Sequence, residues 1–373
     1  MVNLGNVLHL GLKELRCLYR DKVLFIFILI AFTFMIYVAG KAASQELHNA
    51  PIAFVDEDQS PLSARIISAF YPPYFKMPEL IKLADIDPGM DEAKYTFAIN
   101  IPPHFQRDAL AGKRPELQVN VDATQMTQAF IGANYIHNIV LEEVNVYLQG
   151  YRAKPEVPIK LDIRLRFNPT RTAEWFGGVM ELINMITMLS VILSGAALIR
   201  EREHGTLEHL LVMPLTSAEI MISKIWAMGL VVLVAAGLSL RLVIEGILQM
   251  PIAGSIPLFL CATAILLFST TSLGIFLGTV ARTMPQLGLL LILLVLPMQL
   301  LSGGVTPYES MPNIVQTIML AAPTTHFVSI AQAILYRGAG IETVWPDFVA
   351  IIAIGGILFS ASLAIFRKSI TRL

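Results

Sequence analysis

The feature that most constrains this chain is a set of long stretches that contain no Asp, Glu, Lys or Arg. These uncharged stretches cover residues 23–40, 182–199, 225–240, 246–281, 283–308 and 348–366. About 20 apolar helical residues cross the hydrocarbon core of a bilayer. The stretch at 246–281 is too long for one span, but Pro251, Gly254 and Pro257 interrupt it near its start. We therefore predict an α-helical polytopic membrane protein with six transmembrane helices, at residues 23–43, 176–199, 219–245, 257–280, 284–302 and 346–366.

The composition supports this interpretation, because only 15% of the 373 residues are charged, whereas about a quarter is usual for a soluble globular chain. The formal net charge of −1 gives no reason to expect nucleic acid as a partner. The two cysteines, Cys17 and Cys261, lie in or beside apolar stretches, and nothing in the sequence pairs them. Neither a disulfide framework nor a cysteine metal site is indicated.

The first span has a second interpretation, as a cleaved signal peptide, because the small residues of VAGKAAS follow it. Its apolar core is longer than the apolar region of a signal peptide, and a long, mostly polar lead precedes it. We therefore predict an uncleaved anchor.

The orientation follows from the Lys and Arg residues in the short loops, which are enriched on the cytoplasmic side of membrane proteins. With six spans, all the basic loops fall on one side, and their residues are Lys13, Arg16, Arg20, Lys22, Arg200, Arg202, Lys224, Arg282, Arg367, Lys368 and Arg372. On the other side, the 246–256 turn has none and the 303–345 segment has only Arg337. Both termini and the loop at 200–218 are predicted to be cytoplasmic.

Residues 1–22 carry an amphipathic pattern ahead of the first span. Apolar residues fall on one helical stripe, and Lys13, Arg16 and Arg20 lie off it. The stripe consists of Leu4, Leu8, Leu12, Leu15 and Tyr19. We predict a short cytoplasmic helix along the membrane surface. A plain extension of the first span is the alternative.

Residues 44–172, between the first two spans, have the composition of a soluble domain. Apolar runs and alternation predict strands, and capped periodic segments predict helices. Strands are expected at 51–58, 95–102, 116–123 and 159–167, and helices at 60–71, 104–110 and 125–148. This order predicts a small external α/β domain inserted between transmembrane helices 1 and 2.

The predicted external domain shows no sign of catalysis. His104 and His137 fall on different elements, and no GxSxG or HExxH motif occurs there. Asp56 and Asp58 end a strand, where a solvated turn explains them. We interpret the domain as a binding or docking module.

The loop at 200–218 is a dense polar segment between the second and third spans. Its first residues alternate in charge, and they are Arg200, Glu201, Arg202 and Glu203. Gly205 breaks this run, Thr206 is a candidate N-cap for a short helix, and Pro214 ends that helix. Three leucines share one face of the helix, namely Leu207, Leu210 and Leu211. A capped amphipathic helix at the membrane surface suits contact with a cytoplasmic partner.

The third span begins with Thr216 and Glu219, which have the spacing of a capping box. At this point the sequence REREHGTLEHLLVMPLTSAEIMISK (200–224) strongly resembles the cytoplasmic loop of ABC type-2 exporter permeases. The family pattern E-x-E-x-G-T falls on Glu201, Glu203, Gly205 and Thr206. The six-span plan, the large segment after the first span, LSGGVTP (301–307) and PTTHFVSIAQAIL (323–335) also match. The resemblance covers the whole chain and is closest to bacterial inner-membrane permeases of drug- or toxin-efflux type.

The resemblance implies that the loop is a coupling helix that docks on a separate ATP-binding subunit. The implied coupling residues are Glu201, Glu203, Gly205, Thr206, Leu207, Leu210 and Leu211. It also implies a second permease half, identical or related, and a periplasmic position for the external domain. A periplasmic adaptor and an outer-membrane channel often complete such systems. ATP and Mg²⁺ would be bound by the partner, because this chain has no GxxxxGK[ST] motif and no cofactor or enzymatic activity is expected of it.

Two other interpretations of the loop are weaker. His204, His209, Glu203 and Glu208 offer metal-binding groups, but helical spacing would place the two histidines about 140° apart. A plain positively charged turn explains Arg200 and Arg202 but not the capped helix.

A possible transport pathway is suggested by polar and methionine side chains in the second span, namely Glu181, Asn184 and Met188. Methionine adapts to varied apolar shapes, but packing between helices explains these residues equally well. The 303–345 segment is expected to form re-entrant or interfacial helices at the outer surface. His326 either lines the exit of the pathway or makes a structural hydrogen bond to backbone.

Arg241 and Glu245 interrupt the third span near its predicted outer end and are four residues apart. This spacing favours a local ion pair or snorkelling to the interface.

Two rival functions are an ion-driven secondary transporter and a membrane-anchored receptor or assembly factor that acts through its external domain. Apart from Glu245, the spans lack the midplane carboxylates of the first class, and six spans are more than an anchor needs.

Overall fold

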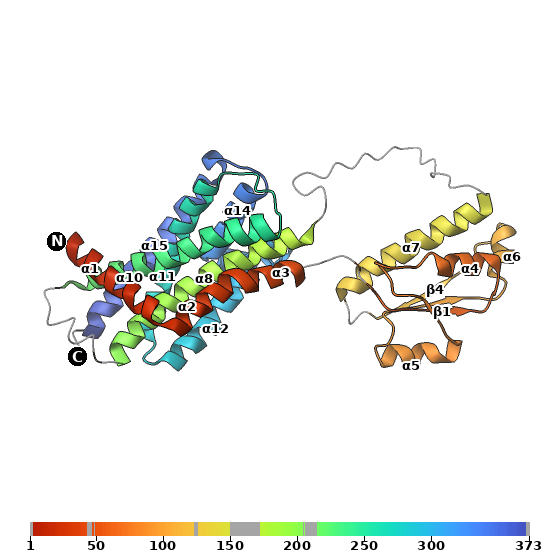
Figure 1. The fold of residues 1–373 in the computed structure, drawn as a ribbon, viewed down its shortest axis with the longest axis horizontal. Helices are drawn as coiled ribbons and strands as arrows, with labels where there is room; N and C mark the ends of the chain where they lie inside the picture. The colour runs from red at the N-terminus through yellow and green to blue at the C-terminus, as the bar shows by residue number, and fades with distance from the viewer. Residues whose placement is uncertain are drawn as a thin grey trace. The chain divides into compact units, whose positions relative to one another are not determined.

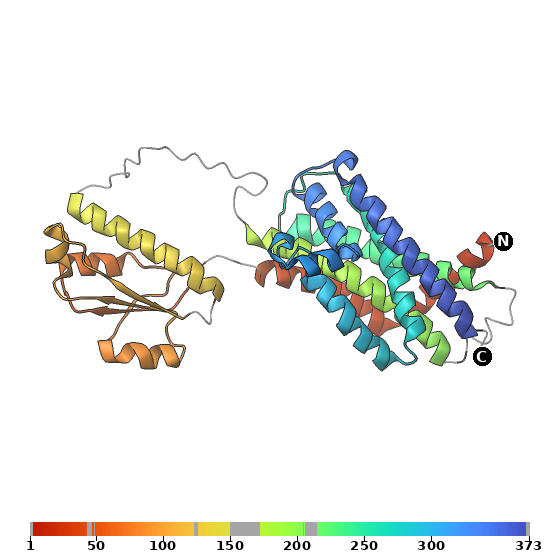
Figure 2. The same cartoon turned by 180° about the vertical axis from the view of Figure 1, so that it is seen from behind.

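The computed structural model describes residues 3–42, 47, 49–122, 126–149, 172–203, 205 and 215–370. The chain divides into two compact units (Figures 1 and 2). The helical unit consists of residues 1–44 and 165–373, and the sheet unit consists of residues 45–164.

The helical unit contains long apolar helices joined by short turns. Its elements are α1 (Leu4–Arg20), α2 (Lys22–Ile30), η1 (Ala31–Met35), α3 (Ile36–Ala42), α8 (Ala173–Glu203), α10 (Ser217–Ser239), η3 (Leu240–Ile247), α11 (Ile256–Val280), α12 (Met284–Leu300), η4 (Tyr308–Ser310), α13 (Asn313–Met319), α14 (Pro323–Leu335) and α15 (Ile341–Ile370). Among the described residues, five helices are long and apolar enough to cross a membrane, namely Lys22–Ala42, Ala173–Glu203, Ser217–Ile247, Ile256–Val280 and Ile341–Lys368. The chain is therefore polytopic and mostly helical.

The region of the predicted fifth span differs from the other spans. The α12 helix has 17 residues, which is shorter than the about 20 needed to cross the hydrocarbon core. The α13 and α14 helices meet at a bend of 86°, as in a broken span or a re-entrant loop. The described residues thus contain five candidate spans, or six if the bent pair counts as one. The predicted set of six spans stays a prediction.

The centre of the helical unit is a close crossing of α8 and α11. A Cβ atom added at Gly278 would lie 2.8 Å from the carbonyl oxygen of Gly195, and one added at Gly274 would overlap Ser194 and the backbone of Val191. Small residues let helix backbones approach in a membrane, where packing drives association. The Ser190 hydroxyl also donates to Thr270 Oγ1 across this crossing, at 2.6 Å. Helices α3, α10, α12, α14 and α15 each pack against one or both helices of this pair.

The N-terminal helix α1 is separate from the first span. Asp21 leaves the helical conformation, with φ −81° and ψ 88°, and its carboxylate accepts a hydrogen bond from the Leu24 backbone N–H. The predicted apolar stripe of α1 is largely exposed, at Leu4, Leu8, Leu12 and Tyr19. A second stripe faces α10 and is buried, at Val7, Gly11, Glu14 and Leu18. The helix therefore packs through one face and leaves the predicted face open.

The sheet unit has four strands in the order β2-β1-β3-β4. Its elements are β1 (Ile52–Asp56), α4 (Pro61–Ser68), β2 (Glu79–Leu80), η2 (Leu83–Asp85), α5 (Ile86–Asp91), β3 (Phe97–Ile101), α6 (Phe105–Leu110), β4 (Gln118–Val121) and α7 (Met126–Gln149). Strand β1 pairs parallel with β2 and β3, and β4 pairs antiparallel with β3. Helices α4 and α7 cover one face and α5 the other (Figures 1 and 2). The core between them is rich in phenylalanine, including Phe54, Phe70, Phe75 and Phe97.

Strands β1, β3 and β4 and helices α4, α6 and α7 are present close to their predicted ranges. The expected first turn of α4 is confirmed, because Ser60 forms a capping box with Ser63 and Pro61 stands at the start of the helix. The short β2 strand and α5 were not predicted. Strand β2 has two residues whose pairing to Ala53 and Phe54 is a tertiary contact. The strand predicted at 159–167 lies outside the described residues.

Candidate coupling site

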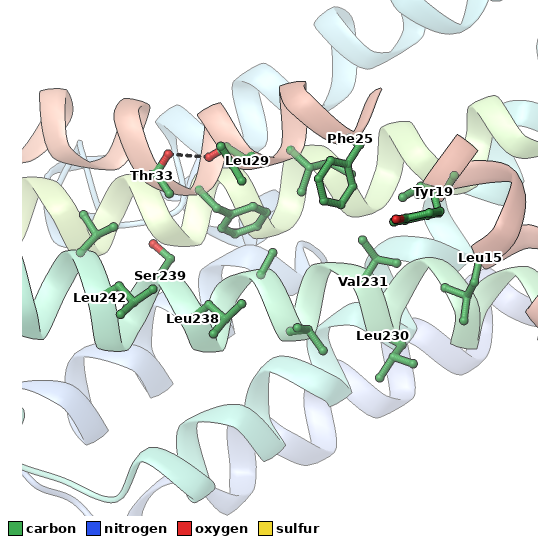
Figure 3. A pocket seen from close by; sticks show the side chains of 16 residues that line it. Leu15, Tyr19, Phe25, Leu29, Thr33, Leu230, Val231, Leu238, Ser239 and Leu242 are labelled. Carbon is green, nitrogen blue, oxygen red and sulfur yellow. Dashed lines mark hydrogen bonds between the residues drawn. The ribbon is translucent and has the colours of Figure 1, made fainter. Parts of the chain in front are cut away.

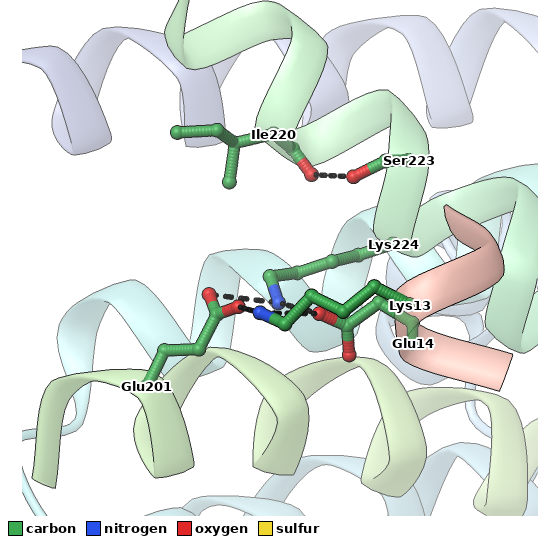
Figure 4. Close-up of polar contacts among 6 residues, drawn as sticks. All are labelled: Lys13, Glu14, Glu201, Ile220, Ser223 and Lys224. Carbon is green, nitrogen blue, oxygen red and sulfur yellow. Dashed lines mark hydrogen bonds and ion pairs between the residues drawn. The ribbon is translucent and has the colours of Figure 1, made fainter. Parts of the chain in front are cut away.

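Four charged side chains meet inside the helical unit where α8 ends, α10 begins and α1 crosses both (Figure 4). Lys224 of α10 lies at the centre, with Nζ 2.9 Å from Glu14 Oε1 and 2.8 Å from Glu201 Oε2. Lys13 Nζ lies 2.9 Å from Glu201 Oε1. The cluster of Lys13, Glu14, Glu201 and Lys224, called here the charge cluster, therefore joins three helices with two positive and two negative groups.

Burial makes the balance of this cluster important. The side chain of Lys224 is only 2% exposed, and those of Glu14 and Glu201 are 9% exposed. A buried charge without a partner is costly, so removing one member of such a pair destabilises by about 3–5 kcal/mol. Partial burial alone would lower the pKa of the half-exposed Lys13, but the Glu201 and Glu14 carboxylates raise that pKa above its usual value. Each cation is thus held by at least one carboxylate.

Further contacts fix α1 on the start of α10. Glu219 Oε1 accepts a hydrogen bond from the Asn3 backbone N–H at 2.6 Å, and Oε2 accepts one from the Thr216 backbone N–H, also at 2.6 Å. Thr216 Oγ1 accepts in return from the Glu219 backbone N–H, so the predicted capping box is confirmed. Trp226 Nε1 donates to the Val7 carbonyl oxygen at 3.2 Å. The predicted capping residue Glu219 therefore also ties two helices together.

The end of α8 is tied to the turn between α11 and α12. Glu203 Oε1 accepts a hydrogen bond from the Met284 backbone N–H, in the first turn of α12, at 3.1 Å. Arg202 Nη1 donates to the carbonyl oxygen of Ala281 at 2.7 Å. Gly205 follows with φ +66° and is exposed. This left-handed conformation is common after helix ends and strongly favours glycine.

The structure thus places the predicted loop residues in two different surroundings. Glu201 forms ion pairs with Lys13 and Lys224, and Glu203 accepts a hydrogen bond from the backbone N–H of Met284 at the start of α12. Both carboxylates anchor the loop from within the chain. The remaining predicted coupling residues, Thr206, Leu207, Leu210 and Leu211, lie outside the described residues, as do the metal-ligand candidates His204, Glu208 and His209. The coupling role of the loop stays a prediction.

Sequence reasoning missed three members of the charge cluster, namely Lys13 and Glu14 as partners and Lys224 as a buried group. Lys13 and Lys224 were interpreted only as positive charges near the membrane surface. One signal was available, because Glu14 belongs to the second helical stripe of α1, spaced by three or four residues from Gly11 and Leu18. A carboxylate on a packing stripe indicates a buried partner.

The proposed pathway residues of α8 lie on one side of that helix. Asn184 Nδ2 is 3.5 Å from Glu181 Oε2, and the Asn184 carbonyl oxygen accepts from Gln299 Nε2 of α12 at 2.9 Å. Met188 is exposed. These three residues therefore share an accessible face beside α12, and a role in transport stays a prediction.

His326 lies elsewhere, between α13 and α15. Its Nδ1 atom is 2.9 Å from Asp347 Oδ1 and its Nε2 atom is 3.0 Å from the Leu320 carbonyl oxygen. The predicted hydrogen bond to backbone is confirmed, and both ring nitrogens are engaged.

Arg241 and Glu245 form the expected local ion pair at 2.7 Å. Within the described ranges, no three His, Cys, Asp or Glu side chains gather in a way that could hold a metal ion.

The long apolar helices and the tightly anchored loop ends define a polytopic α-helical membrane protein. The family model described as ABC-2 family transporter protein matches residues 22–364. The chain belongs to this family and is a permease subunit of the ABC transporter class.

Relatives agree with this assignment over nearly the whole chain. The inner membrane transport permease YhhJ of Escherichia coli (strain K12) is 58% identical over 370 residues, which is 99% of each chain. The probable multidrug ABC transporter permease YbhR of the same strain is 31% identical over 361 residues, covering 96% of this chain and 97% of the relative. The probable multidrug ABC transporter permease YbhS is 23% identical over 339 residues, or 88% of each. These similarities and the apolar helices support a multi-pass protein of the inner membrane, and the family implies an ATP-binding partner subunit.

Proposed function

We propose that this chain is one half of the membrane part of an ABC exporter and that its 200–218 loop couples it to a separate ATP-binding subunit. The partner binds ATP and Mg²⁺, and its movements reach the spans through this loop. Both termini and the loop lie in the cytoplasm, as the distribution of Lys and Arg favours. A second permease half, identical or related, completes the pathway.

The bonds that hold both ends of the loop to other helices are the observation that carries this proposal. The loop leaves α8 just after Glu201 and Glu203 and enters α10 just before Glu219 and Lys224, and all four side chains are bonded to other helices. A push on the loop would therefore move α1, α8, α10 and the start of α12 together. Rigid elements joined by such networks transmit displacement between distant sites.

The cargo we propose is a drug or another amphipathic compound. Two relatives are named multidrug ABC transporter permeases, and the face of α8 with Glu181, Asn184 and Met188 combines polar and adaptable apolar groups. The sheet unit is then periplasmic, where it serves as a binding or docking module for an adaptor that leads to an outer-membrane channel.

Reconstitution with the native partner tests this function. The purified chain alone should hydrolyse no ATP above background, because no P-loop is present in its sequence. The copurified complex should hydrolyse ATP and drive uptake of a fluorescent amphipathic dye into inverted vesicles. Hydrolysis by the pure chain, or dye uptake driven by a proton or sodium gradient without ATP, would overturn the proposal.

A further inference from the structure

A long apolar groove lies between the first span and α10 in the helical unit (Figure 3). Its volume is about 470 Å³, and one wall comes from the end of α1, α2 and η1, the other from α10 and η3. Leu230, Val234, Leu238 and Leu242 form a ridge on the α10 side, at steps of four residues, and all are exposed. Phe25 and Leu29 face them from α2 and are also exposed.

The interior of the groove offers almost nothing to a polar ligand. Thr33 donates its hydroxyl hydrogen to the Leu29 carbonyl oxygen at 2.6 Å, so this group is already bonded. Ser239 is 2% exposed. A flexible hydrocarbon chain suits such a lining, since burying apolar surface is favourable and needs no hydrogen bonds.

The groove is long enough to hold an acyl chain from one leaflet. From Leu230 to Val243 the α10 wall advances 13 residues, which corresponds to about 20 Å of helix. One leaflet contributes about 15 Å to the hydrocarbon core. An acyl chain could therefore lie along most of the groove.

One end of the groove is basic. Leu15, Tyr19 and Phe25 line this end. Arg16 lies three residues before Tyr19, and Lys22 lies three residues before Phe25, so each basic residue shares a helix face with an aromatic residue of the lining. Arg16, Arg20 and Lys22 are exposed, and none forms an ion pair among the residues that the structure describes. The nearby carboxylate of Asp21 is engaged with Arg200 at 3.4 Å. The free charge at this end is therefore positive.

We infer that this groove binds an anionic phospholipid from the leaflet on the N-terminal side. One acyl chain lies between α2 and α10, and the headgroup phosphate contacts Arg16, Arg20 and Lys22. Juxtamembrane clusters of Lys and Arg attract anionic lipids in this way, and Tyr19 and Phe25, in edge contact with ring centroids 6.2 Å apart, mark the interface. The inference needs only that the chain lies in a bilayer, and it is independent of the proposed ATP-binding partner.

Lipid retention by the purified full chain tests the site. Native mass spectrometry after detergent extraction would compare palmitoyl-oleoyl phosphatidylglycerol with the phosphatidylcholine that has the same acyl chains. The anionic lipid should be retained at least tenfold more strongly than the neutral one. The combined change Arg16→Gln, Arg20→Gln and Lys22→Gln should lower the retention of the anionic lipid about tenfold. The matched control removes three exposed charges from the sheet unit, by Lys76→Gln, Lys82→Gln and Arg114→Gln, and should retain lipid normally.

A second measurement locates the bound acyl chain directly. A phosphatidylglycerol with a photoactivatable group in its acyl chain should label the peptide that contains residues 230–242. Filling the groove by Ala235→Phe should reduce this labelling severalfold. The inference would be overturned by equal retention of both lipids or by labelling spread evenly over all spans. It would also be overturned if Ala235→Phe changed the oligomeric state of the chain but not the amount of lipid that it retains.

Discussion

At the scale of single residues, Lys224 determines whether the charge cluster is balanced. It contacts Glu14 and Glu201, which are both buried. Lys224→Met would leave Glu14 without its close partner and Glu201 with Lys13 alone. We expect this change to destabilise the helical unit by about 3–5 kcal/mol, because it leaves a negative charge uncompensated in the interior. Denaturation of the purified chain in detergent or nanodiscs measures the loss.

Lys13→Met is the matched control for that prediction. The Lys13 side chain is 45% exposed, so its loss should cost only about 1 kcal/mol or less. The double variant Glu201→Gln with Lys224→Met should be more stable than the sum of its single changes predicts, by about 1–3 kcal/mol, because the two residues are in direct contact. Additive losses would show that the residues do not interact.

Gly205 has a backbone conformation that favours glycine. Its φ of +66° is left-handed, and a Cβ atom there would meet nothing within 4 Å. The cost of Gly205→Ala is therefore one of backbone strain, about 1–2 kcal/mol. We expect the loop to shift and export to fall while membrane insertion stays normal. Gly340→Ala, at another open glycine without a positive φ, should export at the normal rate; equal losses in both variants would contradict this reasoning.

At the scale of elements, the close approach of α8 and α11 depends on glycine. Alanine ordinarily stabilises a helix interior by about 1 kcal/mol over glycine. Gly274→Ala should reverse this sign, because its methyl group would overlap the backbone of Val191 on α8. Gly356→Ala on α15 meets open space and should be neutral or stabilising. Thermal unfolding of the two variants separates the effects, and a stable Gly274→Ala chain would show that the helices are not so tightly packed.

An element could be predicted from the sequence where the residues that determine it are neighbours in the chain. The start of α10 follows from Thr216 and Glu219, and strands β1 and β3 follow from short, mostly apolar segments of the sequence. The pairing of β2 depends on Ala53 and Phe54, more than 20 residues away, and no local pattern indicates it. The charge cluster joins residues 13, 14, 201 and 224, so its geometry could come only from the packing of α1, α8 and α10.

At the scale of the whole molecule, the proposed orientation predicts which residues an impermeant thiol reagent reaches in intact cells. In a background with Cys17→Ser and Cys261→Ser, Asp85→Cys and Gly340→Cys should be labelled from outside. Glu208→Cys should be labelled only after the membrane is permeabilised, because the basic loops are expected inside. Labelling of Glu208→Cys in intact cells would reverse the topology and remove the loop from the side where ATP is hydrolysed.

The central claim is that the anchored 200–218 loop couples this permease to its ATP-binding subunit, and one comparison tests it most directly. Glu203→Ala removes the bond to the Met284 backbone N–H, whereas Glu309→Ala removes an exposed glutamate of equal charge from a distant turn. Both chains should insert and fold, so the amount of ATP-binding subunit that copurifies with each can be compared at equal expression. The account predicts that Glu203→Ala loses export and most of the copurified subunit while Glu309→Ala keeps both. Full export and normal copurification by Glu203→Ala would contradict it and leave the loop as an ordinary positively charged turn.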